Sequence, residues 1–125
     1  MDKHLYILTG ASRGLGLAMA QQLLVPGNFL LCLSRHTSDA LAGMAQAAGA
    51  GLEQRVQDLA DTVGAAALLV QWLAHQPADR FATASLINNA AVLPRIAPLG
   101  LSNSAELATA MRVGLEAPMQ LTAAF

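Results

Sequence analysis

Eight residues near the N-terminus combine the residue types that a phosphate-binding turn needs: Thr9-Gly10-Ala11-Ser12-Arg13-Gly14-Leu15-Gly16. A glycine at position 10 permits a tight turn that a side chain would obstruct. Gly14 and Gly16 allow backbone to approach a pyrophosphate and a helix to pack close to a sheet. A helix that starts here presents unpaired N–H groups and the positive end of its dipole. The pattern predicts a phosphate-binding loop, in which Ser12 adds a hydroxyl donor, formed by Gly10, Ser12, Arg13, Gly14, Leu15 and Gly16.

The elements on either side of this loop have the pattern that such a motif requires. Residues 4–8 form a short apolar run suited to a buried strand. Residues 15–24 carry apolar side chains at helical spacing, and Pro26-Gly27 ends that helix. The glycine spacing is Gly-x-x-x-Gly-x-Gly rather than the more familiar Gly-x-Gly-x-x-Gly. A strand, a glycine turn and a helix in succession nevertheless favour a phosphate-binding role over a purely structural turn.

The next apolar run ends in residues that bear on the choice of a nucleotide. Asn28 to Leu33 is continuously apolar after its first residue, as in a strand buried on both faces of a parallel sheet. It leads into Ser34-Arg35, where a protein that binds NAD usually places an acid for the ribose 2′-hydroxyl. Arg35 can instead pair with a 2′-phosphate, and Arg13 is a second candidate. The alternative is that both arginines are solvated loop residues. The pattern favours NADP over NAD.

Asp58-Leu59 follows a third apolar patch around Leu52 and Val56. At a strand end, Asp58 could accept a hydrogen bond from an adenine amino group. It could equally cap the helix that begins near Asp61-Thr62, because aspartate is a favourable N-cap residue. The residues alone leave both roles open.

A fourth run, Ala84 to Ile87, leads into Asn88-Asn89-Ala90-Ala91. Small residues at Ala90 and Ala91 would let a ribose lie against the strand end. Asn88 and Asn89 have side chains that can bridge backbone groups of neighbouring strands, so part of their role is structural. We expect Asn89, Ala90 and Ala91 to belong to the nucleotide site.

Three other segments carry weaker predictions. Residues 40–51 are rich in alanine and glycine, which predicts a loosely specified helix and loop. Residues 93–100 contain two prolines and should be irregular. Ser102 or Ser104 can cap a last helix, which Pro118 should kink.

Composition excludes several function classes. The net charge of −1 gives no electrostatic case for nucleic acid or an anionic membrane. No apolar run approaches the roughly 20 residues of a membrane span, and the charged start is not a secretory signal. We therefore expect a cytoplasmic protein. The three histidines lack metal-ligand spacing, so no metal site is expected, and Cys32 should be an inert buried thiol.

Four ordered motifs resemble the N-terminal half of the short-chain dehydrogenase/reductase family. Residues 9–16 match its glycine motif, Asp58-Leu59 its adenine-site pair, and residues 88–91 its Asn-Asn-Ala-Gly motif, with Ala91 replacing the last glycine. Residues 113–118 resemble its Val-Asn-Leu-x-Ala-Pro segment. The resemblance covers essentially the whole chain and implies an NADP-dependent oxidoreductase of the carbonyl reductase or alcohol dehydrogenase type.

Two departures from that family bear on catalysis. The family's active-site asparagine falls on Gly114, which has no side chain to hold a proton-relay water. The family's serine and its Tyr-x-x-x-Lys pair would lie beyond Phe125, and the chain's one tyrosine, Tyr6, lies in the first predicted strand. No catalytic residue is therefore assigned, and we expect the chain alone to be inactive, as a truncated product. The alternative is a complete, non-catalytic nucleotide-binding or interaction module.

These inferences combine into one expected architecture. The chain should form a single NADP-binding, Rossmann-like α/β domain over residues 1–125, with three layers and a parallel sheet in the order 3-2-1-4. Its strands should lie near residues 4–9, 29–34, 52–57 and 84–89. An unpaired fourth strand and a bare apolar stripe on the helix near residues 104–125 would favour association. We expect a homo-oligomer that buries this helix.

Overall fold

A computed structural model describes residues 2–125 of the chain. Four parallel strands form one sheet in the order β3-β2-β1-β4. The strands are β1 (His4–Thr9), β2 (Asn28–Ser34), β3 (Gly51–Val56) and β4 (Thr83–Ile87). Each predicted strand is present to within two residues at either end. The Rossmann-like fold class and the strand order predicted from the sequence are confirmed.

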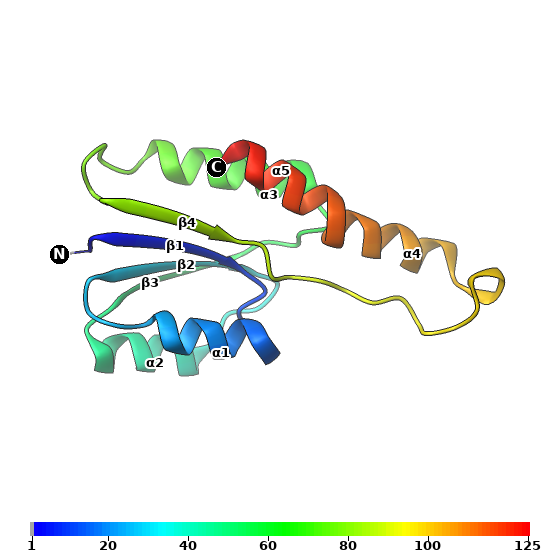
Figure 1. Cartoon of the computed structure of the whole chain (residues 1–125), viewed down its shortest axis with the longest axis horizontal. Coiled ribbons are helices and arrows are strands. Elements are labelled where there is room, and N and C mark those ends of the chain that lie inside the picture. Colours follow the sequence, from blue (N-terminus) through cyan, green and yellow to red (C-terminus); the bar gives the residue numbers. More distant parts are fainter. Residues whose placement is uncertain (1) are drawn as a thin grey trace.

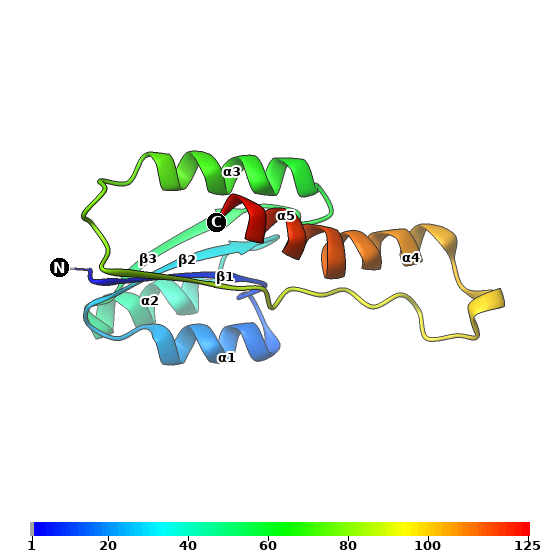
Figure 2. The same ribbon diagram turned by 45° about the horizontal axis from the view of Figure 1, so that its top comes forward.

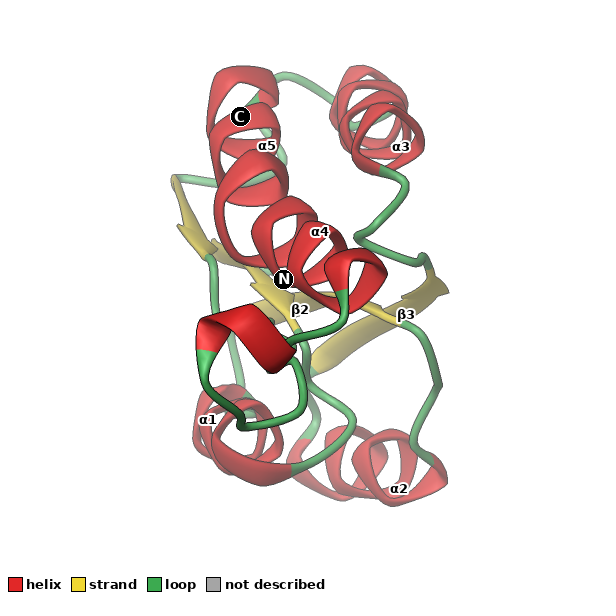
Figure 3. Cartoon of the chain, turned by 90° about the vertical axis from the view of Figure 1, so that its right-hand side faces the viewer, coloured by secondary structure: helices red, strands yellow, loops and turns green. Residues whose placement is uncertain are grey.

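Helices cover both faces of the sheet, which gives three layers (Figures 1 and 3). On one face lie α1 (Gly14–Leu23) and α2 (Asp39–Ala48). On the other lie α3 (Thr62–Ala74) and α5 (Ala117–Ala124), side by side. None of the helices described between residues 2 and 125 is long and apolar enough to cross a membrane.

The core is divided by the sheet into two clusters, as expected from the two-residue alternation of strand side chains. Leu31 and Leu33 of β2 pack toward α3 and α5 with Leu69 and Leu121. Leu30 and Cys32 pack toward α1 and α2. All seven residues of β2 are buried, because β2 lies between β1 and β3 with helices on both faces. Burial raises the pKa of the Cys32 thiol to about 12, so the thiol stays protonated at neutral pH.

The segment after β2 is better defined than its composition predicts. The helix and loop expected over residues 40–51 are present, and the helix is more firmly specified than expected because α2 is capped at both ends. The Ser38 hydroxyl accepts a hydrogen bond from Leu41 N, and Gly49 ends the helix at a φ of 68°. That left-handed conformation is one that glycine adopts without strain.

Beyond β4 the chain leaves the body of the sheet and returns. Residues 92–103 are irregular apart from the 3₁₀ turn η1 (Leu99–Leu101), and α4 (Ser104–Met111) follows. Figures 1 and 2 both show this part projecting away from the sheet. The cap of α4 is Asn103, whose Oδ1 accepts from Glu106 N at 3.1 Å, so the prediction of Ser102 or Ser104 is wrong. Asparagine is as favourable as serine at this position, and here its side chain has the required place before the first turn.

The last helix is irregular upstream of the proline that should kink it. A π turn, η2 (Arg112–Glu116), joins α4 to α5, and Pro118 is within the first turn of α5. Proline lacks an N–H and its ring crowds the carbonyl four residues earlier, at Gly114. The wide turn therefore lies where the proline prevents regular α-helical hydrogen bonding.

Candidate functional site

A cavity of about 400 Å³ opens at the edge of the sheet where the parallel strands end. All of the residues assigned to a nucleotide site from the sequence line it: Gly10, Ser12, Arg13, Gly14, Leu15, Gly16, Ser34, Arg35, Asp58, Leu59, Asn89, Ala90 and Ala91. The carboxyl ends of strands in an open parallel sheet are where such folds bind ligands. The structure thus brings four separate segments, one after each strand, together around one cavity.

Five further residues line the cavity that sequence reasoning missed: Leu33, His36, Gln57, Val92 and Val113. Four of them are direct neighbours of predicted residues, so extending each motif by one position would have found them. Val113 belongs to the π turn, 22 positions after Ala91 in the sequence, and the signal that could have found it is the resemblance of residues 113–118 to the family's Val-Asn-Leu-x-Ala-Pro segment.

The glycine loop lies tightly against Asn89 and Ala90, which follow β4. Gly10 has a φ of 71°, and a Cβ there would lie 3.0 Å from Ala90 Cα. A Cβ on Gly16 would overlap the carbonyl oxygen of Gly10. Gly14 has a φ of 59° but open space around it, so its requirement is conformational only. The glycines therefore serve a close approach of backbone to backbone as well as an approach to a ligand.

The N-terminus of α1 faces the cavity without a side-chain cap. Arg13 takes the N-cap position but its side chain accepts no hydrogen bond from the helix, and the first turn contains no acid. The first N–H groups of an α-helix have no partners within the helix. Those of Gly14, Leu15 and Gly16, which line the cavity, are therefore suited to an anion.

A network between Thr9 and Asn89 fixes the two halves of the site to each other. The Thr9 hydroxyl oxygen accepts from Asn89 N at 3.0 Å and from Ala90 N at 2.9 Å. The Asn89 amide donates to Thr9 O and Gly10 O at 3.1 and 3.2 Å. The expected bridging role of the asparagine pair is thus found for Asn89. Asn88 instead donates to the Thr122 hydroxyl of α5 at 3.3 Å.

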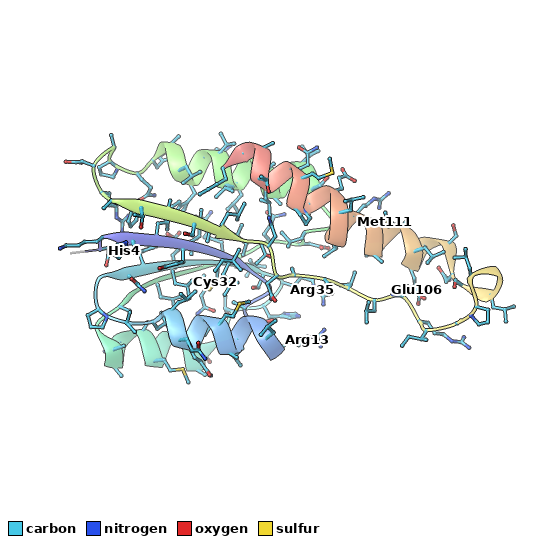
Figure 4. The ribbon with its side chains drawn as sticks, in the orientation of Figure 1. His4, Arg13, Cys32, Arg35, Glu106 and Met111 are labelled. Carbon is cyan, nitrogen blue, oxygen red and sulfur yellow. The ribbon has the colours of Figure 1, made fainter. Side chains whose placement is uncertain are left out.

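Hydrogen bonds hold the end of β2 on both sides, and the two arginines that are candidates for a 2′-phosphate lie nearby. The Ser34 hydroxyl accepts from Ala11 N at 3.0 Å, and Ser34 O accepts from Gln57 N at 2.9 Å. Arg13 and Arg35 are exposed at the same end of the sheet (Figure 4). Within residues 2–125 neither arginine forms an ion pair, and no acid neutralises them directly. Their guanidinium groups are available to an anionic ligand.

Asp58 does not cap the helix that follows it. The cap of α3 is Asp61, whose Oδ1 accepts from Gly64 N at 3.0 Å. Asp58 Oδ1 accepts from Ala60 N at 2.9 Å, which stabilises the turn after β3. The residue lines the cavity, so its carboxylate can accept from a ligand there. Among residues 2–125 no three His, Cys, Asp or Glu side chains gather closely enough to hold a metal ion.

The π turn closes the cavity from the side of α3. Val113 is buried and lines the cavity. The Thr62 hydroxyl, at the start of α3, donates to Glu116 at 2.6 Å and holds the turn in place. Gly114 is exposed, and a Cβ at that position would meet no atom within 4 Å. A larger residue could therefore be accommodated there.

Comparison with known proteins gives concordant results. The model of the short chain dehydrogenase family matches residues 4–125. The chain is 34% identical over 121 residues to a benzil reductase ((S)-benzoin forming) of Bacillus subtilis (strain 168), which covers 97% of this chain and 47% of that protein. It is 34% identical over 129 residues to the sepiapterin reductase of Xenopus laevis, covering 95% of this chain and 48% of the relative.

A solved structure agrees with the sequence matches. A metagenomic short-chain oxidoreductase in complex with NADP superposes with a TM-score of 0.86 at 31% identity, over 100% of this chain and 56% of that one. The chain spans about half the length of the curated relatives it matches. It belongs to the short-chain dehydrogenase family.

Proposed function

We propose that this chain is the NADP(H)-binding half of an oxidoreductase that interconverts a carbonyl compound and an alcohol. The observation that carries the proposal is the uncapped N-terminus of α1, which faces a cavity also lined by two arginines that form no ion pair with any described residue from 2 to 125. An anionic dinucleotide satisfies both features at once, with its pyrophosphate over the helix and its 2′-phosphate against the arginines.

The position of each residue along the cavity suggests which part of the dinucleotide it would bind. The backbone of Gly14, Leu15 and Gly16 would bind the pyrophosphate, with Ser12 as a further donor. Asp58 would accept from the adenine amino group, and Leu59 would contact the ring. The small side chains of Ala90 and Ala91 would leave room for the nicotinamide-side ribose. The nicotinamide supplies the hydride when it is bound.

Three observations support NADP over NAD. Arg35 follows β2 where an acid would favour NAD, and Arg13 lines the same cavity. The metagenomic relative binds NADP in its solved structure. Guanidinium groups form strong, paired hydrogen bonds to phosphate.

The reaction itself requires groups that this sequence does not carry. In the family it resembles, a tyrosine acts as general acid and a nearby lysine lowers its pKa. Here the one tyrosine, Tyr6, lies in β1, and the one lysine is Lys3. We expect the 125-residue polypeptide to bind the nucleotide without turnover. Carbonyl reduction is proposed for a whole protein that contains this half.

A non-catalytic nucleotide-binding module is the second candidate, and Gly114 favours it. The family resemblance places an active-site asparagine at this position. A Cβ there would meet no atom within 4 Å, so the fold does not require glycine. The loss of that side chain is what a protein that binds but does not catalyse would tolerate.

We also propose a homo-oligomer that buries one face of the last helix. Met111, Leu115 and Met119 recur every four residues and are exposed, whereas Val113, Ala117 and Leu121 are buried. A second apolar stripe is thus present beside the one that packs on the core. Such stripes on a surface helix favour association.

The cofactor assignment is tested with the variant Arg35→Ala. Removal of a charge-assisted contact should weaken NADPH binding by about 1.5–3 kcal/mol, and NADH binding should change little. The dissociation constants are measured by isothermal titration calorimetry. Arg95→Ala is the matched control, because Arg95 is exposed and does not line the cavity. Equal losses for both nucleotides, or an equal loss in the control, would refute the assignment.

A further inference from the structure

β3 forms one edge of the sheet, and its outer side meets no other strand within residues 2–125. The sheet order places β3 next to β2 alone (Figure 3). On the α3 side, a hollow of about 480 Å³ lies beside this edge, and Arg55, Gln71, Trp72 and His75 are among its lining residues. Val56, the last residue of the strand, is 65% exposed. An edge with such open surroundings can pair with a further strand.

One hydrogen bond shows which backbone groups of β3 point outward. Gln57 N, directly after β3, donates to Ser34 O of β2. The N–H and C=O groups of successive residues point alternately to the two sides of a strand, so the odd-numbered residues of β3 bond to β2. The backbone groups of Leu52, Gln54 and Val56 therefore point away from β2. In the part of the chain that the structure describes, these groups have no hydrogen-bond partner.

The sequence of β3 is complementary to itself when two copies run antiparallel. A two-fold axis at Gln54 places this residue opposite its own counterpart. Glu53 then lies opposite Arg55 of the second copy, so opposite charges meet twice. Leu52 lies opposite Val56 of the second copy, which pairs two apolar side chains. Opposite charges directly across an antiparallel pair stabilise it, whereas like charges destabilise it.

The direction of the backbone groups selects the same register. With the axis at Gln54, the three outward residues form the hydrogen-bonded pairs. Glu53 and Arg55 fall in the non-hydrogen-bonded pairs, where side chains lie closer together. An axis one residue away would set Glu53 against Glu53, or Arg55 against Arg55. Both charges are already positioned at this edge, because Trp72 Nε1 donates to Glu53 Oε2 at 2.7 Å and Arg55 Nη1 lies 3.2 Å from Glu53 Oε1.

We propose that β3 is an interaction surface for a second copy of this chain, whose β3 adds antiparallel and joins the two sheets into one. The contact involves neither the nucleotide cavity nor the last helix, so it goes beyond the proposed function. An edge of six residues is small beside the roughly 1,200–2,000 Å² of a stable interface. The contact therefore forms well above micromolar concentration, where association through the last helix is already complete.

The direct test measures amide hydrogen exchange along β3 by NMR. The full chain carries Met119→Glu, which removes the proposed contact of the last helix, and is compared at micromolar and millimolar concentration. We expect the outward N–H groups, those of Leu52, Gln54 and Val56, to exchange more slowly at the higher concentration. The alternate N–H groups already bond to β2 and should change little.

Charge reversals in the same background test the register by sedimentation velocity. Glu53→Arg and Arg55→Glu each set like charges opposite one another, so either should weaken self-association by about tenfold. An equal mixture of the two variants should associate again, because each reversal then meets its complement. Arg95→Glu, which reverses an exposed charge away from β3, is the matched control and should associate as the parent does.

A backbone variant covers the case in which a reversal prevents folding, which circular dichroism detects. Val56→Pro removes one outward N–H and leaves the hydrogen bonds to β2 intact, so it should weaken association without a change of charge. Outward amides that do not respond to concentration would overturn the proposal. So would association that persists in Val56→Pro and in each single reversal, or a mixture of reversals that stays monomeric. Nucleotide binding, measured separately, is unaffected by either result.

Discussion

Two regions of the molecule differ in how much of their structure is fixed by contacts within the chain. The site edge, which we define as residues 9–16 and 88–91, is held by close backbone approaches and by the hydrogen bonds of Thr9 and Asn89. The arm, residues 93–111, projects from the body (Figure 1) and leaves large apolar side chains in the open. Leu93 and Ile96 are 84% and 92% exposed. The contrast shows that contacts within the chain fix the site edge, whereas the arm leaves large apolar side chains exposed.

Replacing a glycine by alanine should give the largest difference in folding stability between the two regions. Gly16→Ala places a methyl group against the carbonyl oxygen of Gly10, which must move. We expect a loss of about 1–3 kcal/mol in the free energy of unfolding, as for other overpacked sites, together with weaker NADPH binding. Urea denaturation followed by circular dichroism measures the first effect.

The matched control for that substitution is Gly114→Ala, in the π turn after the arm. A Cβ there meets nothing within 4 Å, and alanine is the better helix former by about 1 kcal/mol. This variant should be as stable as the wild type or slightly more so. If both variants lose stability equally, the close approach at Gly16 has no special importance.

Threonine substitution tests the same comparison through hydrogen bonds. Thr9→Val removes the acceptor of two N–H groups, those of Asn89 and Ala90, and keeps the shape of the side chain. Leaving partly buried donors without a partner should cost about 1–3 kcal/mol. On the arm, the hydroxyl of Thr109 only donates to Ala105 O within the same helix, so Thr109→Val should change stability little. If the Thr9→Val protein has wild-type stability in urea, the hydrogen bonds that join Thr9 to Asn89 and Ala90 do not stabilise the fold.

A substitution on the exposed face of the last helix should have the smallest effect on folding stability but a clear effect on oligomeric assembly. Met119→Glu introduces a charge into the proposed interface at a side chain that is 65% exposed. We expect the variant to be monomeric by light scattering and unchanged in stability, because no core contact is lost. Val70→Glu on α3, where the side chain is 51% exposed, is the control and should leave the assembly intact. A wild-type chain that is monomeric at micromolar concentration would contradict the proposed interface.

Much of the fold and most of the site could be predicted from the sequence, because their signals are local. The glycine loop is a continuous motif between a strand and a helix. Arg35 follows directly after β2 and Asp58 lies two residues after the end of β3, so the sheet topology alone brings them to the same edge. A parallel sheet places all its carboxyl ends together, which is why separate motifs meet without any long-range information.

The features that could not be predicted depend on contacts between distant segments. Thr62 donates to Glu116 and so holds the π turn, with Val113 at the cavity, against α3; this hydrogen bond joins residues 54 positions apart, and propensity and periodicity do not predict it. Thr9 opens the glycine motif, but its two accepted hydrogen bonds come from residues 80 and 81 positions later. The capped helix α2, in contrast, could have been predicted from Ser38 and Gly49, since both are favourable cap residues.

A crystal structure of the chain with NADPH would test directly whether this cavity binds the nucleotide. We expect the pyrophosphate to lie over the N–H groups of Gly14, Leu15 and Gly16. We also expect the 2′-phosphate to contact the guanidinium of Arg35. A nucleotide bound elsewhere, for example in the hollow lined by Arg55, Gln71 and His75, would contradict the proposed function. So would a 2′-phosphate that points into solvent away from Arg13 and Arg35.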